Sequence, residues 1–172
     1  MQRPITRANA LLGLGVLAGA ALATTRWATA ATQGAHHAFE VAFSDDVWRK
    51  RLTPEQFEIL RRAGTEQPES SPLLREHRAG TFACAGCALP VFDSSTKFDS
   101  GTGWPSFFRP LPNAIETTTD TSLFETRTEV HCRRCGGHLG HVFDDGPKPT
   151  GLRYCMNGAA LSFTPRTAPA PK

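Results

Sequence analysis

The sequence predicts a mainly β fold, chiefly antiparallel, preceded by one or two helices. Two patterns support this prediction: short runs rich in β-forming residues alternate with turns from Thr81 onward, and a helix-start signal stands at residues 53–56. The length of 172 residues suits one domain of ordinary size. With 40% apolar and 20% charged residues, the chain is neither a low-complexity disordered protein nor one with several membrane spans.

Helices are expected just before the β-rich part of the chain. Residues 45–52 have helical polarity. Thr53 then stands as a capping residue, followed by Pro54 in the first turn and by Gln56 three residues after the cap. Because glycine commonly ends helices, we expect this second helix to stop at Gly64.

The β-rich runs account for most of the remaining chain. Eight of them are expected to form strands: residues 81–84, 90–93, 97–99, 114–119, 122–130, 138–143, 152–157 and 160–163. The turns between them are short, as antiparallel pairing allows.

The first 30 residues have the pattern of an export signal. Arg3 and Arg7 precede a mostly apolar run over residues 8–23, and small residues at 28–30 offer a cleavage site. We therefore expect residues 1–30 to direct the protein to the periplasm. The apolar run is shorter than the roughly 20 residues that span a bilayer. An uncleaved membrane anchor stays open, as does the choice between the general and twin-arginine export routes.

Charge and composition do not point to a nucleic-acid partner. The three arginines of the export signal account for the whole formal net charge of +3, so the rest of the chain is neutral. No glycine-rich loop that could hold a phosphate is present in the sequence. We expect residues 31–44 to be a linker, residues 45–166 to form the functional domain, and residues 167–172 to be a disordered tail.

Two CxxC pairs predict a metal site, Cys84 with Cys87 and Cys132 with Cys135. Each pair lies in a turn that contains or precedes glycine and can aim two sulfur atoms at one point. Four thiolates are the typical ligand set of structural Zn²⁺. Iron on the same ligands stays open as an alternative. So does a pair of disulfides, because exported proteins meet oxidising conditions, although disulfides closed within a CxxC are strained.

Cys155 is the fifth cysteine and has no partner in this scheme. A lone thiol is by default a buried structural residue. In a strand, however, Arg153 and Asn157 would project from the same face as Cys155. A guanidinium beside a thiol favours the thiolate, which is the reactive form. Cys155 is therefore the candidate nucleophile.

His138 and His141 follow the second cysteine pair, so the metal site could anchor them in space. Their three-residue spacing places them on opposite faces of a regular strand. Both can serve one site only if the chain bulges or turns near Gly140, and we predict that irregularity. From the residues alone, the two histidines also stay open as zinc ligands.

Three longer motifs surround these residues: 101–107 (GTGWPSF), 138–147 (HLGHVFDDGP) and 153–157 (RYCMN). In this order around two CxxC pairs, they resemble the B-type methionine sulfoxide reductases, and the resemblance runs from about Asp45 to Phe163. It implies two antiparallel sheets with a remote four-cysteine zinc site. It also implies thiol-dependent reduction of the R epimer of methionine sulfoxide, mainly in proteins, as a repair of oxidative damage.

The resemblance also implies roles for individual residues. Cys155 would be the nucleophile, Trp104 would pack on the substrate methyl group, and the other site residues would be His138, His141, Phe143, Arg153 and Asn157. Reduction needs a thiolate to attack the sulfoxide sulfur and an acid to protonate the oxygen, and Cys155 and His141 fit these roles. The enzyme-bound product would be a Cys155 sulfenic acid, which a thiol must reduce.

Thr102 is a departure from many family members, which carry a resolving cysteine at that position. Every other cysteine is expected to bind zinc, so none is left to form an internal disulfide with Cys155. We therefore expect an external thiol to reduce the sulfenic acid directly, either a thioredoxin-like protein or a small thiol. The expected form is a monomer that meets oxidised proteins or peptides, with membrane contact only if the leader is uncleaved.

Two functions of other classes stay open. A non-catalytic zinc-binding interaction module would tolerate a Cys155→Ser substitution without measurable effect. A cysteine hydrolase would use Cys155 on an acyl carbon with His141 as base, but it would leave residues 103–107 (GWPSF) unexplained and lacks an oxyanion-hole signature.

Overall fold

The computed structural model describes residues 38–122 and 125–167. The predicted export signal, the first half of the predicted linker and residues 168–172 of the predicted tail lie outside the described residues. The described part is mainly β, with two antiparallel sheets and two α-helices, as expected. Within it, no helix has both the length and the apolar character needed to cross a membrane.

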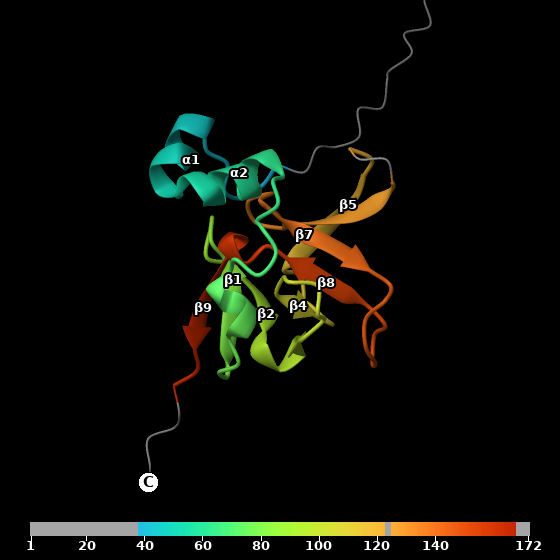
Figure 1. The fold of residues 1–172 in the computed structure, drawn as a ribbon. Helices are drawn as coiled ribbons and strands as arrows, with labels where there is room; N and C mark the ends of the chain where they lie inside the picture. The colour runs from blue at the N-terminus through green and yellow to red at the C-terminus, as the bar shows by residue number, and fades with distance from the viewer. Residues whose placement is uncertain (1–37, 123–124, 168–172) are drawn as a thin grey trace, which may run out of the picture. The chain divides into compact units, whose positions relative to one another are not determined.

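The two α-helices, α1 (Asp45–Arg51) and α2 (Pro54–Arg62), precede all the strands (Figure 1). The predicted cap is present at Thr53. Its hydroxyl accepts a hydrogen bond from the Gln56 N–H at 3.2 Å, and the Gln56 side chain accepts one from the Thr53 N–H at 3.1 Å. The helix ends close to the predicted position at Gly64. Its last residue is Arg62, because Ala63 takes the left-handed conformation, with φ 53°.

The described strands form two sheets in which every pairing is antiparallel. The three-stranded sheet has the order β2-β1-β9, and the six-stranded sheet has the order β3-β4-β8-β7-β6-β5. The strands are β1 (Gly80–Cys84), β2 (Pro90–Asp93), β3 (Lys97–Phe98), β4 (Ser106–Phe107), β5 (Ile115–Asp120), β6 (Arg127–Cys132), β7 (His138–Phe143), β8 (Arg153–Met156) and β9 (Leu161–Pro165). Three 3₁₀ helices complete the described elements: η1 (Pro72–Arg75), η2 (Ser94–Thr96) and η3 (Gly158–Ala160).

Most strands agree with the sequence-based expectation to within two residues at each end, and two strands differ by more. Strand β4 was not predicted, because its two residues show no alternation of apolar and polar side chains. Strand β6 begins at Arg127 rather than at Ser122. Pairing of β5 with β6 starts at Asp120 opposite Arg127, so the described residues Thr121, Ser122, Glu125 and Thr126 lie outside the paired strands.

Aromatic rings from both sheets meet in the core. Phe107 of β4 stacks on Phe92 of β2 with ring centroids 4.3 Å apart, and it meets Phe82 of β1 edge to face at 5.0 Å. All three side chains are fully buried. Helix α2 packs against β7 and η3, and buries Phe57 and Leu60. The six-stranded sheet is therefore fixed against both the smaller sheet and the helices.

Residues 38–44 contain no helix or strand, yet they contact the second cysteine turn. The Val41 N–H donates to the Arg134 carbonyl at 3.0 Å, and Glu40 forms an ion pair with Arg133 at 2.7 Å. The described half of the predicted linker therefore packs on the domain.

Candidate active site and metal centre

The two cysteine pairs occupy turns with the same backbone hydrogen bonds. In each turn, the N–H of the first cysteine donates to the carbonyl five residues later, and its carbonyl accepts from the N–H four residues later, all at 2.8 Å. The residue after the second cysteine is Ala88 in one turn and Gly136 in the other, with φ 58° and 65°. The left-handed conformation of this residue lets both turns close in the same way, with the two sulfur atoms of each pair on one side.

The four sulfur atoms form one cluster. All lie within 4.8 Å of one another. Cys84 Sγ lies 3.7 Å from Cys135 Sγ, and Cys87 Sγ lies 3.5 Å from Cys132 Sγ. Tetrahedral zinc, with Zn–S bonds of about 2.3 Å, requires sulfur separations of about 3.8 Å. The cluster therefore fits a tetrahedral ion, and the alternative of disulfides is not realised because all five cysteines are unbridged.

The metal centre joins the two sheets. The first cysteine turn connects β1 to β2, and the second connects β6 to β7. Hydrogen bonds from Cys132 and Cys135 hold the pKa of Cys87 well below that of an ordinary thiol. Thiolate is the form that binds metal, so binding of an ion releases the remaining thiol protons of the cluster.

A separate cavity of about 130 Å³ lies in the six-stranded sheet region. At about 30 Å³ per water molecule, it has room for roughly four waters or one small side chain. None of the metal-centre cysteines lines it. Its lining residues are Thr65, Trp104, Arg127, Gly140, His141, Phe143, Cys155 and Asn157.

The register of the six-stranded sheet places Cys155 in this cavity. Cys155 of β8 pairs with Ser106 of β4 on one side and with His141 of β7 on the other. Directly opposed residues of antiparallel strands present their side chains on the same face of the sheet. His141 is therefore the cross-strand neighbour of Cys155, and both side chains line the cavity.

The predicted irregularity near Gly140 is present. The pairing of β6 with β7 shifts register beside this residue. As a result, the rings of His138 and His141 meet edge to face with centroids 5.3 Å apart, although a regular strand would separate them. A Cβ atom at Gly140 would collide with the carbonyl oxygen of Cys155, so the close approach of β7 to β8 requires glycine here.

His141 is paired with a carboxylate. Its Nε2 lies 2.8 Å from Asp120 Oδ2. Because an ionised carboxylate can only accept, Nε2 carries the hydrogen and Nδ1 is the nitrogen able to take a proton. Hydrogen bonds from Ser122 and then from His141 hold the pKa of Asp120 well below its usual range. Burial lowers the pKa of His141, so the ring is mainly neutral at pH 7.

His138 contacts the His141 ring and is not among the residues that line the cavity. Its Nδ1 bonds Glu129 Oε1 at 2.8 Å, and this bond lowers the pKa of Glu129. Its Nε2 is buried and has no hydrogen-bond partner among the described residues. Each histidine is thus oriented by its own carboxylate.

Arg153 also lies outside the cavity lining, two residues before Cys155 on β8. Its guanidinium makes two hydrogen bonds to the Asp145 carboxylate, both 2.8 Å, and lies over the Phe143 ring at 4.3 Å. The bond to Asp145 raises the pKa of Arg153, and the negative charge of a Cys155 thiolate raises it further. A fixed cation therefore stands near the candidate nucleophile.

Glu66 holds two cavity residues through its backbone. Its carbonyl accepts a hydrogen bond from Trp104 Nε1 at 3.2 Å, and its N–H donates to Asn157 Oδ1 at 3.0 Å. The Asn157 amide also donates to the Leu139 carbonyl at 3.3 Å. Both polar atoms of the Asn157 side chain are thus used to bind backbone.

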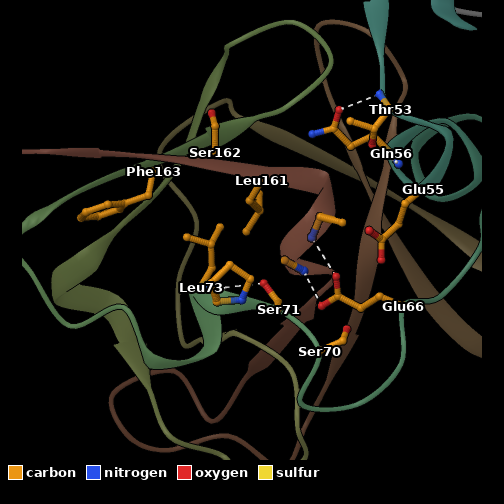
Figure 2. A pocket seen from close by; sticks show the side chains of 13 residues that line it. Thr53, Glu55, Gln56, Glu66, Ser70, Ser71, Leu73, Leu161, Ser162 and Phe163 are labelled. Carbon is orange, nitrogen blue, oxygen red and sulfur yellow. Dashed lines mark hydrogen bonds between the residues drawn. The ribbon is translucent and has the colours of Figure 1, made fainter.

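The Glu66 carboxylate is committed to η3. It accepts hydrogen bonds from the N–H groups of Gly158 at 2.7 Å and Ala159 at 2.8 Å, and Figure 2 shows both bonds. Burial raises the pKa of Glu66. The carboxylate borders a second cavity of about 390 Å³, whose lining residues include no cysteine or histidine. We therefore assign the chemistry to the smaller cavity.

Glu66→Gln is expected to lower the free energy of unfolding by about 1–3 kcal/mol, because an amide N–H₂ would replace one of the two acceptors of the η3 N–H groups. For a chain of this size, that loss corresponds to a melting temperature lower by about 2–12 °C. Thermal unfolding followed by circular dichroism measures the change. Glu55→Gln, on the exposed rim of the same cavity, is the matched control. Equal melting temperatures for both variants would contradict the structural role of Glu66.

The structure gathers most of the sequence-predicted site residues. Trp104, His141, Phe143, Cys155 and Asn157 line the cavity, and His138 and Arg153 lie next to it.

Sequence reasoning missed Thr65, Arg127 and the orienting groups Asp120, Glu129 and Glu66. Arg127 and Glu129 stand two apart in one β-rich run, and Glu129 is the cross-strand partner of His141. Pairing that run with the histidine run was the signal that could have found them.

A free cysteine and a carboxylate-paired histidine thus line one cavity, and a four-cysteine cluster able to hold a metal ion lies apart from it. Comparison with known proteins gives the family. The chain belongs to the SelR domain family, whose family model matches residues 52–165. The family resemblance expected from the motifs is thereby confirmed.

Similar proteins come from bacteria and a plant. The peptide methionine sulfoxide reductase MsrB of Leifsonia xyli subsp. xyli is 57% identical over 129 residues, which are 74% of this chain and 93% of the relative. The protein of the same name in Pseudomonas putida is 56% identical over 120 residues, 69% of this chain and 90% of the relative. The chloroplastic peptide methionine sulfoxide reductase B1 of Arabidopsis thaliana is 53% identical over 123 residues, 71% of this chain and 61% of the relative.

Proposed function

We propose that this protein reduces the R epimer of methionine sulfoxide, mainly in proteins, through a Cys155 sulfenic acid that an external thiol then reduces. The observation that carries the proposal is the cavity shared by Cys155, His141 and Trp104, in a chain whose relatives are named peptide methionine sulfoxide reductases. The choice of the R epimer follows from the family resemblance.

The cavity suits the side chain of methionine sulfoxide. Its volume of about 130 Å³ accommodates one small side chain. Trp104 and Phe143 supply apolar walls for the methyl and methylene groups. Arg127 lines the same cavity, and its guanidinium forms an ion pair with Asp120 at 2.6 Å, so a cationic group borders the place proposed for the sulfoxide oxygen.

In the proposed reaction, His141 moves the proton. Neutral His141 takes the thiol proton of Cys155 on Nδ1, and Asp120 stabilises the resulting imidazolium. The thiolate attacks the sulfoxide sulfur while His141 returns the proton to the sulfoxide oxygen. The attack forms a bond between Cys155 Sγ and the methionine sulfur. When the protonated oxygen then moves to Cys155 Sγ, that S–S bond and the bond from oxygen to the methionine sulfur both break. Methionine sulfur gains two electrons, Cys155 loses two, and the products are methionine and a sulfenic acid.

Other residues position these groups. Arg153 favours the thiolate through its charge, and it is fixed by Asp145 and Phe143. His138 packs on the His141 ring and limits its rotation. Asn157 binds the backbone of β7 and of Glu66, and so holds the segment that follows Cys155.

We also propose zinc as the ion of the metal centre. Four thiolate donors at near-tetrahedral spacing fit Zn²⁺, and its contribution is structural. The four cysteines do not line the cavity, so the proposed reaction uses the protein groups alone.

The test of the proposed function is dithiothreitol-driven reduction of the separated R and S epimers of a methionine sulfoxide peptide. We expect turnover of the R epimer only, measured by chromatography of the methionine product. Turnover of the S epimer alone, or of neither epimer, would contradict the proposal.

Direct reduction of the sulfenic acid has a test of its own. After exposure of metal-loaded protein to substrate without thiol, a sulfenic-acid trap should label Cys155, and mass spectrometry should find no internal disulfide. Thr102→Cys is the matched control, because Thr102 Oγ1 lies 3.7 Å from Cys155 Sγ and a thiol there should form the disulfide. A Cys155 disulfide in the unmodified chain would overturn the proposed regeneration.

A further inference from the structure

Three hydroxyl groups form a hydrogen-bonded chain that begins at Cys155. Thr102 Oγ1 lies 3.7 Å from Cys155 Sγ and 2.8 Å from Ser100 Oγ. Ser100 Oγ lies 2.7 Å from Ser106 Oγ, which lies 3.1 Å from the carbonyl oxygen of Trp104. We call these three side chains, Thr102, Ser100 and Ser106, the hydroxyl chain. It approaches the sulfur from β4 and the loop before it.

Counting hydrogens gives one arrangement that fills all of these bonds when Cys155 is protonated. The hydroxyl chain makes four links, from the sulfur to the Trp104 carbonyl, and the thiol plus three hydroxyls supply four hydrogens. A carbonyl oxygen can only accept, so Ser106 donates to it, Ser100 donates to Ser106, and Thr102 donates to Ser100. The Cys155 thiol can then donate to Thr102, which fills every link, and the thiol turns to His141 Nδ1 when it gives up its proton.

Loss of the thiol proton reverses the direction of the hydrogen bonds along the hydroxyl chain. A thiolate can only accept, so Thr102 must turn its hydrogen toward Cys155 Sγ. Ser100 can then donate to Thr102, and Ser106 to Ser100. Each donation polarises the next hydroxyl, so the hydrogen bond that reaches the sulfur is stronger than that of an isolated hydroxyl. The bond given up is the neutral one to the Trp104 carbonyl, which is weaker than a bond to a thiolate.

We propose that the hydroxyl chain is a second, uncharged source of thiolate stabilisation at Cys155, with Thr102 as the direct donor and Ser100 and Ser106 as positioning residues. The inference rests on the proposed role of Cys155 as nucleophile. Thr102 stands where many family members carry a resolving cysteine, and the inference gives its hydroxyl a function at that position. Ser106 is fully buried and is the register partner of Cys155, so the far end of the chain is rigid.

Several charged or titratable groups also surround Cys155. They are Arg153 on its own strand, His141 on β7 and Arg127 on β6, with Asp120 on β5 paired to both His141 and Arg127. The carboxylates of the neighbouring segments bond elsewhere, Asp99 to the Gly101 N–H and Glu66 to the N–H groups at the start of η3. Substitutions within the hydroxyl chain leave all of these groups in place. A change in the pH profile of Cys155 reactivity in such variants therefore reports on the hydroxyls.

The experiment is iodoacetamide alkylation of the full metal-loaded chain across pH 5–10, with the Cys155 peptide quantified by mass spectrometry. Thr102→Val keeps the shape and removes the hydroxyl, and Thr102→Ser keeps the hydroxyl. We expect Thr102→Val to slow alkylation at pH 7 by about tenfold and to displace its pH profile upward. Thr102→Ser should keep the profile of the unmodified chain.

Ser100→Ala tests the chain beyond the direct donor. It should shift the profile in the same direction by a smaller amount, and it carries the test if Thr102→Val does not fold. An unshifted profile in Thr102→Val, or equal shifts in Thr102→Val and Thr102→Ser, would overturn the inference. An unshifted Ser100→Ala profile would overturn the cooperative part of it.

Alkylation requires no sulfoxide, so this test is separable from that of the proposed function. If the variants show the expected shifts in their alkylation profiles but the protein reduces neither epimer, the proposed function is contradicted and the inference about the hydroxyl chain is supported.

Discussion

Cys155→Ser is expected to lower the turnover of methionine-R-sulfoxide by on the order of 10⁴-fold or more. A serine hydroxyl at this position is almost fully protonated near pH 7, and it cannot form the sulfenic acid through which the proposed reaction passes. Turnover with dithiothreitol as reductant measures the loss.

Tyr154→Phe is the matched control for this substitution. Tyr154 is the chain neighbour of Cys155 and does not line the cavity, so removal of its hydroxyl should leave turnover close to that of the unmodified chain. Both variants should keep the melting temperature and metal content of the parent protein. Residual activity above about a tenth in Cys155→Ser would show that another group is the nucleophile.

Removal of the metal ion should have the largest effect on stability. Structural zinc in small sites binds with an apparent free energy of about 10–16 kcal/mol, whereas a whole domain is stable by about 5–15 kcal/mol. Because the ion would tie β1 and β2 to β6 and β7, its loss should unfold the β domain or lower its melting temperature by more than about 20 °C.

Thermal unfolding before and after chelation measures this effect, and Cys87→Ser is the genetic equivalent. Elemental analysis should find about one zinc ion per chain. Less than about half an equivalent of tightly held metal in native protein, or unchanged unfolding after chelation, would contradict the metal centre.

The parts of the fold that depend on local chemistry were predictable from the sequence. The signal for the Thr53 cap lies within four consecutive residues, and both hydrogen bonds of the cap are present. Strands with several alternating residues were found at nearly their true bounds. Strand β4 was missed because only its neighbours β3 and β8 make it a strand, and two residues carry no periodic signal.

The candidate site also contains residues that the sequence could predict and residues that it could not. Cys155 and the metal-centre cysteines stand out by residue type and spacing, so sequence analysis could propose them. Asp120 and Glu129 could not be proposed, because they reach the histidines through hydrogen bonds that depend on strand register. The hydroxyl chain was equally hidden, since serine and threonine are common residues whose mutual distances appear only after folding.

Glu66 contributes to the cavity in a way that depends little on its identity. Trp104 and Asn157 are held by the N–H and carbonyl at position 66, and nineteen of the twenty amino acids offer both groups. The placement of the aromatic wall is therefore encoded in the path and length of the connection between α2 and η1. A residue inserted into this connection would displace the backbone groups that bind Trp104 and Asn157, whereas a change of side chain at position 66 would leave both groups in place.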